Sequence, residues 1–271
     1  MEKEDIIEYT KCNKYRILEK IYERADKKSA YYVAEDSILG RKVGIKQVKK
    51  EKSNKQEQEV KLMLRTSEIT PFIPKIYDVI EKRNEILIIM EHIEGKTLRQ
   101  CLNTEKDKIY RNHKIIFKKL CNILQEINYE HRDLKPENII ITKFKNENYK
   151  DVYLIDFGLA SLYPFADEGT KRYQAPEQKE ETDKTIKANK NSKIDIFSSG
   201  IILYEMIMGE PPIEGKNYSL QEKNTEWTIF NELKEKGIEQ KEIDFIKKCL
   251  EINPQNRFSD KRNMNFSYRH I

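Results

Sequence analysis

The sequence predicts an α+β protein. Five runs rich in β-branched and aromatic residues lie before residue 92, and a single helical pattern interrupts them. After residue 97 the apolar residues recur mostly at helical spacing. The chain has 271 residues, which is enough for one large domain or two packed lobes with a substantial core.

The N-terminal third alternates β-formers with charged or turn-forming residues. Its first three runs predict an antiparallel meander, the polar segment that follows predicts a helix, and two more strands come next. The predicted strands are 15–21, 30–35, 42–48, 75–81 and 85–91, and the predicted helix is 54–66.

The rest of the chain is predicted to be mainly helical. The expected helices are 97–103, 108–128, 195–208, 227–236 and 241–250, and two short strands are expected at 138–141 and 151–155. The segment 179–192 is rich in lysine and asparagine without an apolar period, which predicts an exposed insertion. We expect no further domain after Arg257.

Composition excludes several classes of protein. The 51 basic and 46 acidic residues nearly cancel, and the net charge of +5 is too diffuse to indicate nucleic-acid or membrane binding. The four cysteines have no metal-type spacing and no close pair, which favours a reducing compartment. The N-terminus is charged where a signal peptide is apolar, and no apolar run approaches a membrane span. We therefore expect a cytoplasmic protein without membrane insertion.

Two motifs carry the chemistry: HRDLKPENIIIT at residues 131–142 and YLIDFGLA at residues 153–160. Asp133 and Asp156 each adjoin a short predicted strand, so their loops are expected to lie side by side. Phosphoryl transfer needs one carboxylate to accept a hydroxyl proton, and another carboxylate with an amide oxygen to hold magnesium. Asp133 suits the first task, whereas Asp156 and Asn138 suit the second.

The order His-Arg-Asp-Leu-Lys-x-x-Asn followed by Asp-Phe-Gly resembles the catalytic and magnesium loops of eukaryotic-type serine/threonine protein kinases. The resemblance implies a bilobal fold in a single kinase domain, residues 1–271. An N-lobe of about 1–93 would hold an antiparallel sheet and one helix, and a C-lobe of about 94–271 would be mainly helical. ATP and Mg²⁺ are the implied cofactors.

The same resemblance assigns roles in the N-lobe. Val43-Gly44-Ile45-Lys46 is similar to the family's V-A-I-K strand, which implies that Lys46 contacts the α- and β-phosphates. Glu59 is the expected ion-pair partner of Lys46, with Glu57 as the rival. The segment 90–95 is similar to the hinge, where the backbone of Glu91 and Ile93 would bind the adenine edge.

Further roles follow in the C-lobe. By resemblance, Lys135 neutralises the transferring phosphoryl group and indicates the serine/threonine type. Asp195 is similar to the aspartate that braces the catalytic loop, and it can also cap its helix. Arg257 is similar to the arginine that pairs with Glu177, which would make a buried ion pair.

Residues 169–173 are similar to the family's peptide-docking strand, in which Thr170 would bridge Asp133 and Lys135. Ahead of them, Ser161 and Tyr163 offer hydroxyls for phosphorylation, while Asp167 and Glu168 offer permanent negative charge. Both a switched and a constitutively ordered loop remain open.

The departure from the family is the loop that covers the phosphates, which normally needs glycine so that backbone amides approach phosphate oxygens. No glycine precedes Gly40, and the corresponding turn is 22–29. Ser29 could replace the last glycine and Lys27 or Lys28 could add charge, or the turn could be a solvated hairpin tip.

These observations predict a serine/threonine protein kinase that acts on protein hydroxyls. One alternative is a pseudokinase scaffold, which the missing glycines favour and the complete set of charged groups opposes. Another is a small-molecule kinase of related fold, which the peptide-docking pattern opposes.

Overall fold

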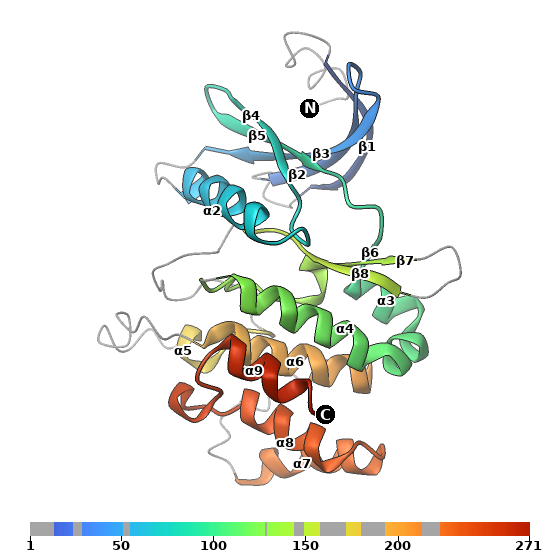
Figure 1. Ribbon diagram of the computed structural model, residues 1–271, viewed down its shortest axis with the longest axis vertical. Coiled ribbons are helices and arrows are strands. Elements are labelled where there is room, and N and C mark those ends of the chain that lie inside the picture. Colours follow the sequence, from blue (N-terminus) through green and yellow to red (C-terminus); the bar gives the residue numbers. More distant parts are fainter. Residues whose placement is uncertain are drawn as a thin grey trace. The chain divides into compact units, whose positions relative to one another are not determined.

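The computed structural model describes residues 14–23, 29–50, 55–127, 129–143, 149–157, 172–179, 193–212 and 223–271. The predicted phosphate-covering turn and the predicted insertion at 179–192 lie largely outside these residues. The chain divides into two compact units, Met1–Glu94 and Gly95–Ile271 (Figure 1).

The first unit contains a five-stranded antiparallel sheet in the order β1-β2-β3-β5-β4. One described helix, α2, accompanies it and contacts β4. The elements are β1 Tyr15–Glu23, β2 Ser29–Asp36, β3 Arg41–Lys49, α2 Lys55–Ile69, β4 Ile76–Glu81 and β5 Glu85–Glu91.

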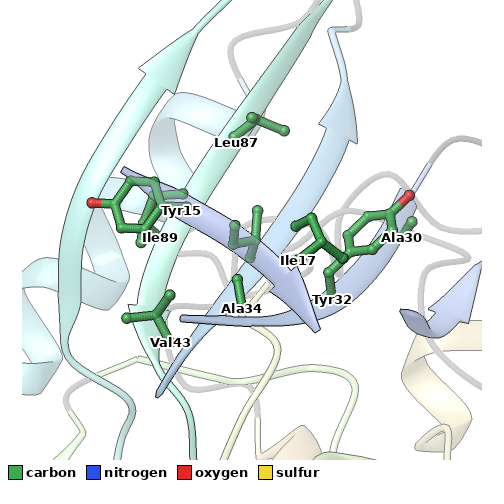
Figure 2. Packing of buried hydrophobic residues seen from close by; sticks show 9 residues of the cluster. Tyr15, Ile17, Ala30, Tyr32, Ala34, Val43, Leu87 and Ile89 are labelled. Atoms are coloured by element: carbon green, nitrogen blue, oxygen red, sulfur yellow. The ribbon is translucent and has the colours of Figure 1, made fainter. Parts of the chain in front are cut away.

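The two faces of this sheet have different roles. Alternate residues of a strand point to opposite faces, and directly opposed residues of antiparallel strands share a face. One face forms a hydrophobic core, shown in Figure 2, which contains Tyr15, Ile17, Ala30, Tyr32, Ala34, Val43, Ile45, Leu87 and Ile89. The intervening positions share the other face, and they include Tyr31, Val33, Gly44, Lys46, Ile88 and Met90. We call this second face the lysine face.

The second unit is mainly helical and carries a small sheet in the order β6-β7-β8. Its strands are β6 Lys96–Thr97, β7 Ile139–Lys143 and β8 Tyr149–Leu154. Its helices are α3 Leu98–Thr104, α4 Lys106–Glu126, α5 Pro176–Lys179, α6 Ile194–Met208, α7 Lys223–Glu235, α8 Gln240–Cys249 and α9 Lys261–Tyr268, with 3-10 turns at Pro136–Asn138 and Pro254–Asn256.

Helix α6 is buried along nearly its whole length, from Ile194 to Ile207. A helix that is apolar on every side requires cover on every side, and α6 contacts both α4 and α8 (Figure 1). It ends at Gly209, whose φ of 85° is the left-handed geometry that favours glycine at a helix C-terminus. The polar residues within α6 are therefore buried, and each needs a partner.

The predicted elements are confirmed with shifts of a few residues at their ends. The predicted helix 227–236, for example, begins earlier, at Lys223, and the predicted helix 54–66 continues to Ile69. Three of the described helices and strands were not predicted: β6, α5 and α9. Strand β6 has two residues and α5 has four, and α9 is a short polar helix, so none of them carries a strong periodic signal.

Candidate functional site

Lys46 is positioned by β3, on the lysine face of the first unit. It lies opposite Tyr31 on β2 and Ile88 on β5, and its side chain is half-buried. Flanking residues Ile45 and Val43 point to the opposite face and anchor the strand in the core. Lys46 and Ile45 lie on different faces because successive side chains of a strand point to opposite sides of the sheet.

Tyr31 and Gly44 are close neighbours on the same face. A Cβ atom on Gly44 would overlap the Tyr31 hydroxyl, so the tyrosine side chain lies over the glycine backbone. The Tyr31 hydroxyl is 3.5 Å from His92 Nδ1, and burial raises the pKa of Tyr31 to about 12. The sequence interpretation missed Tyr31; the glycine in place of the alanine of V-A-I-K was the available signal.

The segment 90–95, which is expected to bind the adenine base, begins in the last two residues of β5. The Glu91 N–H donates to the Lys75 carbonyl at 2.8 Å, which ties the end of β5 to the segment before β4. Met90 and Ile93 are buried, with 5% and 8% of their surfaces exposed. This burial is expected of residues whose backbone, rather than side chain, faces a ligand.

Glu59 and Glu57 both lie in α2, as predicted. Their side chains are outside the part of the structure that is described. The pairing of Lys46 with Glu59 therefore stays a prediction.

In the second unit Asp133 belongs to a compact polar cluster. Its Oδ2 accepts hydrogen bonds from Lys135 Nζ at 2.6 Å and from Asn138 Nδ2 at 3.3 Å. Asn138 Nδ2 also donates to the Asp133 carbonyl at 2.8 Å. The 3-10 turn Pro136–Asn138 makes these contacts possible because it folds Asn138 back toward Asp133. The structure thus brings three predicted site residues together.

The backbone before Asp133 is held by Asp195. This residue lies in the first turn of α6, where its two oxygens accept the N–H groups of His131 and Arg132 at 2.8 and 3.0 Å. Arg132 has a φ of 69°, a conformation that costs free energy for a residue with a side chain. The bracing predicted for Asp195 is confirmed, and it stabilises this strained turn.

Asp156 is brought next to this loop by the pairing of β7 with β8. The Ile155 N–H donates to the Asn138 carbonyl at 2.9 Å, and the Ile155 carbonyl lies 3.1 Å from His131 Nε2. The His131 ring also packs on Phe157, with 4.8 Å between the ring centroids. Asp156 itself is exposed and has a φ of 63°. Its carboxylate is therefore presented at the surface of a tightly fixed turn.

Asn138 and Asp156 fit a magnesium ion. Both of the Asn138 bonds to Asp133 use its amide nitrogen, which is the arrangement that presents the amide oxygen as a ligand. Mg²⁺ takes oxygen ligands and is commonly held by one or two carboxylates together with phosphate oxygens and water. Among the described residues there is no group of three or more His, Cys, Asp or Glu side chains that could hold a metal alone.

A second polar cluster surrounds Glu205, which is fully buried in α6. Arg99 Nη1 lies 2.5 Å from Glu205 Oε1, and Arg99 Nε lies 2.8 Å from Glu137 Oε1. The Tyr173 hydroxyl donates to Glu205 Oε2 at 2.8 Å. The sequence interpretation did not predict this cluster. The signal was a glutamate in the apolar second half of the helix, because a buried carboxylate requires a partner.

Several predicted residues of the loop after Asp156 lie outside the described residues. They are Ser161, Tyr163, Asp167, Glu168, Gly169 and Thr170. Tyr173, at the end of that loop, is described and is buried.

Comparisons with known proteins agree on one family. The family model for the protein kinase domain matches residues 28–268. The chain is 31% identical over 208 residues to serine/threonine-protein kinase cds1 of Schizosaccharomyces pombe, covering 70% of this chain and 43% of that protein. It is 34% identical over 213 residues to calcium-dependent protein kinase 6 of Plasmodium berghei, covering 74% of this chain and 13% of that protein.

The fold also matches a solved structure, Rad53 1-466 in complex with AMP-PNP. The TM-score is 0.70 with 22% sequence identity, and the match covers 96% of this chain and 67% of that one. The matches to the two curated relatives span less than half of each relative's length. In the described residues, no helix is long and apolar enough to cross a membrane.

Proposed function

Because this chain belongs to the protein kinase family, we propose that it transfers the γ-phosphoryl group of ATP to serine or threonine hydroxyls of proteins. The observation that carries the proposal is the hydrogen-bonded cluster of Asp133, Lys135 and Asn138 beside Asp156. We further propose that residues 1–271 form a single kinase domain, with an N-lobe of about 1–93 and a C-lobe of about 94–271.

Asp133 is the proposed catalytic base. Its carboxylate orients the acceptor hydroxyl and takes its proton as the hydroxyl oxygen attacks the γ-phosphorus and the bond to the ADP oxygen breaks. Lys135, whose Nζ lies 2.6 Å from Asp133 Oδ2, is placed to contribute positive charge to the transferring group. A lysine at this position supports the serine/threonine assignment.

Asn138 and Asp156 would hold Mg²⁺, which supplies positive charge that neutralises the phosphate oxygens. The bond between the Ile155 N–H and the Asn138 carbonyl keeps the backbone of the two loops in a fixed relation. Electrostatic stabilisation of phosphoryl transfer depends on such prior positioning, because little energy is then spent on reorganisation.

In the first unit, Lys46 is the proposed ligand of the α- and β-phosphates, and Glu59 the residue that fixes it. The backbone of Glu91 and Ile93 is proposed to bind the adenine edge. Because the Glu91 N–H already donates to Lys75, the contact at Glu91 would be made by its carbonyl. ATP as the nucleotide is supported by the structural neighbour Rad53, which was solved with AMP-PNP.

A pseudokinase scaffold is the second candidate, since no glycine precedes Gly40 and the loop that covers the phosphates normally depends on glycine. The charged groups argue against it, because a scaffold does not need Asp133, Lys135, Asn138 and Asp156 in one arrangement. A small-molecule kinase is a third possibility, and activity on an aminoglycoside or choline but on no peptide would favour it.

One experiment separates the enzyme from the scaffold. Wild type, Asp156→Ala and the control Asp244→Ala, which changes an exposed aspartate of α8, are incubated with radiolabelled ATP, Mg²⁺ and a generic basic protein. The proposal predicts transfer by wild type and by the control, and none by Asp156→Ala. Absence of transfer in wild type, with a melting temperature that rises on adding ATP and Mg²⁺, would support the scaffold.

A further inference from the structure

Lys261 is a buried lysine at an unusual place. It is the first residue of α9, directly after the N-cap Asp260, and only 10% of its side chain is exposed. A cation in the first turn of a helix opposes the helix dipole, and a lysine ordinarily keeps its ammonium in water. Some specific interaction must therefore hold this side chain inside.

Three oxygens surround the Lys261 ammonium. Nζ donates to Asp195 Oδ2 and to the Tyr129 carbonyl, both at 2.7 Å, and it lies 3.7 Å from Glu130 Oε1. Glu130 in turn accepts the backbone N–H of Asp195 through Oε2 at 2.8 Å. Two carboxylates thus share one ammonium in a largely buried position. Without Lys261, the buried charge of Asp195 would lose its ion-pair partner.

The electrostatics agree with this arrangement. Burial would lower the pKa of Lys261, but the charges of Asp195 and Glu130 outweigh burial and raise it. Burial and the nearby Asp195 raise the pKa of Glu130 to about 8. Burial would raise the pKa of Asp195, but the ammonium of Lys261 outweighs it and lowers that pKa. Lys261 and Asp195 thus stay charged, while Glu130 readily holds a proton.

The cluster acts on four consecutive residues of the loop. Lys261 fixes the Tyr129 carbonyl, Glu130 is bonded to Asp195, and Asp195 holds the amides of His131 and Arg132. Residue 133 comes next. The strained turn at Arg132 aims Asp133, so a change in its support is expected to move the Asp133 carboxylate.

We propose that Lys261 is a positioning residue for phosphoryl transfer, which orients Asp133 through its bonds to Asp195 and to the Tyr129 carbonyl. Glu130 completes the cluster. The inference rests on the proposed function for its catalytic consequence, and on the hydrogen bonds alone for its effect on the loop. It assigns to α9, which was not predicted from sequence, a role in the site.

The first test compares Lys261→Met with Lys241→Met, a matched control in which an exposed lysine near the start of α8 is changed. At a temperature well below both melting points, Lys261→Met is expected to lower kcat roughly ten- to hundredfold and to leave KM for ATP nearly unchanged. The control is expected to change neither.

A second readout does not depend on activity. Hydrogen exchange at the amides of His131 and Arg132 is expected to speed up in Lys261→Met, because the acceptor Asp195 loses its countercharge. If wild type shows no phosphoryl transfer, the proposed function fails, while this readout still decides whether Lys261 positions the loop.

The double variant Asp195→Asn with Lys261→Met separates positioning from simple stability, and it also serves if Lys261→Met alone does not fold. Asparagine removes the buried charge that Lys261 balanced, so thermal stability is expected to recover, but kcat stays low because the ammonium that held residue 195 and the Tyr129 carbonyl is still missing. The inference is overturned if kcat recovers together with stability, or if Lys261→Met lowers the melting temperature without changing kcat or exchange at His131 and Arg132.

Discussion

Arg257 and Glu177 form a bidentate ion pair inside the second unit. Arg257 Nη1 lies 2.6 Å from Glu177 Oε1, and Nη2 lies 2.8 Å from Oε2. Only 2% of Arg257 is exposed, and its remaining N–H groups donate to the carbonyls of Lys193, Glu251 and Ile252. The pairing expected from sequence is confirmed. It links the segment after α8 to the short helix α5.

Replacing Arg257 with alanine is expected to destabilise the second unit strongly. Removing one partner of a buried pair leaves the other charge uncompensated and costs about 3–5 kcal/mol. A loss of this size lowers the melting temperature by roughly 6–20 °C in a unit of this length. The measurement is thermal unfolding, with the exposed Arg262→Ala as control. Equal melting temperatures for the two variants would contradict the structural role of the pair.

Gly44→Ala tests the packing on the lysine face. The new methyl group would collide with the Tyr31 hydroxyl, and overpacking of this kind costs roughly 1–3 kcal/mol. The same substitution in a Tyr31→Val background is expected to cost far less, because the obstructing ring is gone. The double-mutant cycle is measured by denaturant unfolding. Additive effects of the two substitutions would show that Tyr31 does not lie over Gly44.

The fold was largely predictable because most of its elements have a clear local signal. Strands β1 to β5 are short runs rich in β-branched and aromatic residues, and α6 is a long, mostly apolar helix, so each pattern indicates its element. The register that places Tyr31 beside Lys46 was not predictable, since pairing depends on how the strands align. The position of α9 was missed as well, because a short polar helix docked through one lysine has no repeating signature.

The site was predictable to the extent that its residues are close in sequence. Asp133, Lys135 and Asn138 lie within one motif, and their contacts follow from the tight turn that joins them. Lys261 and Glu205 come from distant helices: Lys261 bonds to Asp195, which holds the loop before Asp133, and Glu205 pairs with Arg99, which contacts Glu137. Such contacts depend on tertiary packing, and a lone lysine or glutamate is ordinarily a solvated residue. The sequence pattern therefore predicted which residues of the candidate site lie together, and it missed the contacts that distant helices make around them.

Glu130→Gln is expected to change how stability depends on pH. A glutamate carboxyl has an ordinary pKa of 4.5, whereas the folded protein raises the pKa of Glu130 to about 8. Protonation of Glu130 therefore stabilises the folded state fully below about pH 4.5. This stabilisation is lost as the pH rises through about 8. Glutamine does not titrate. The melting temperature of Glu130→Gln relative to wild type is therefore expected to rise from about pH 5 to about pH 8.5.

The charged groups that face Glu130 are Asp195 of α6 and Lys261 of α9, and both are present in wild type and in Glu130→Gln. Their own titration therefore contributes nearly equally to the dependence of melting temperature on pH in wild type and in Glu130→Gln. Glu235→Gln, at an exposed position of α7, is the control and is expected to show a constant difference from wild type. A constant or falling difference for Glu130→Gln would contradict the assigned protonation.

The rate of phosphoryl transfer by Asp133→Asn tests the central proposal, that Asp133 accepts the proton of the acceptor hydroxyl. Asparagine keeps the size of the side chain but cannot accept the hydroxyl proton, and loss of a general base typically lowers the rate about 10²- to 10⁴-fold. The rate of transfer to a serine- or threonine-containing peptide should fall by that amount, while ATP with Mg²⁺ still raises the melting temperature. A wild-type rate in Asp133→Asn would contradict the assignment of Asp133 as the base.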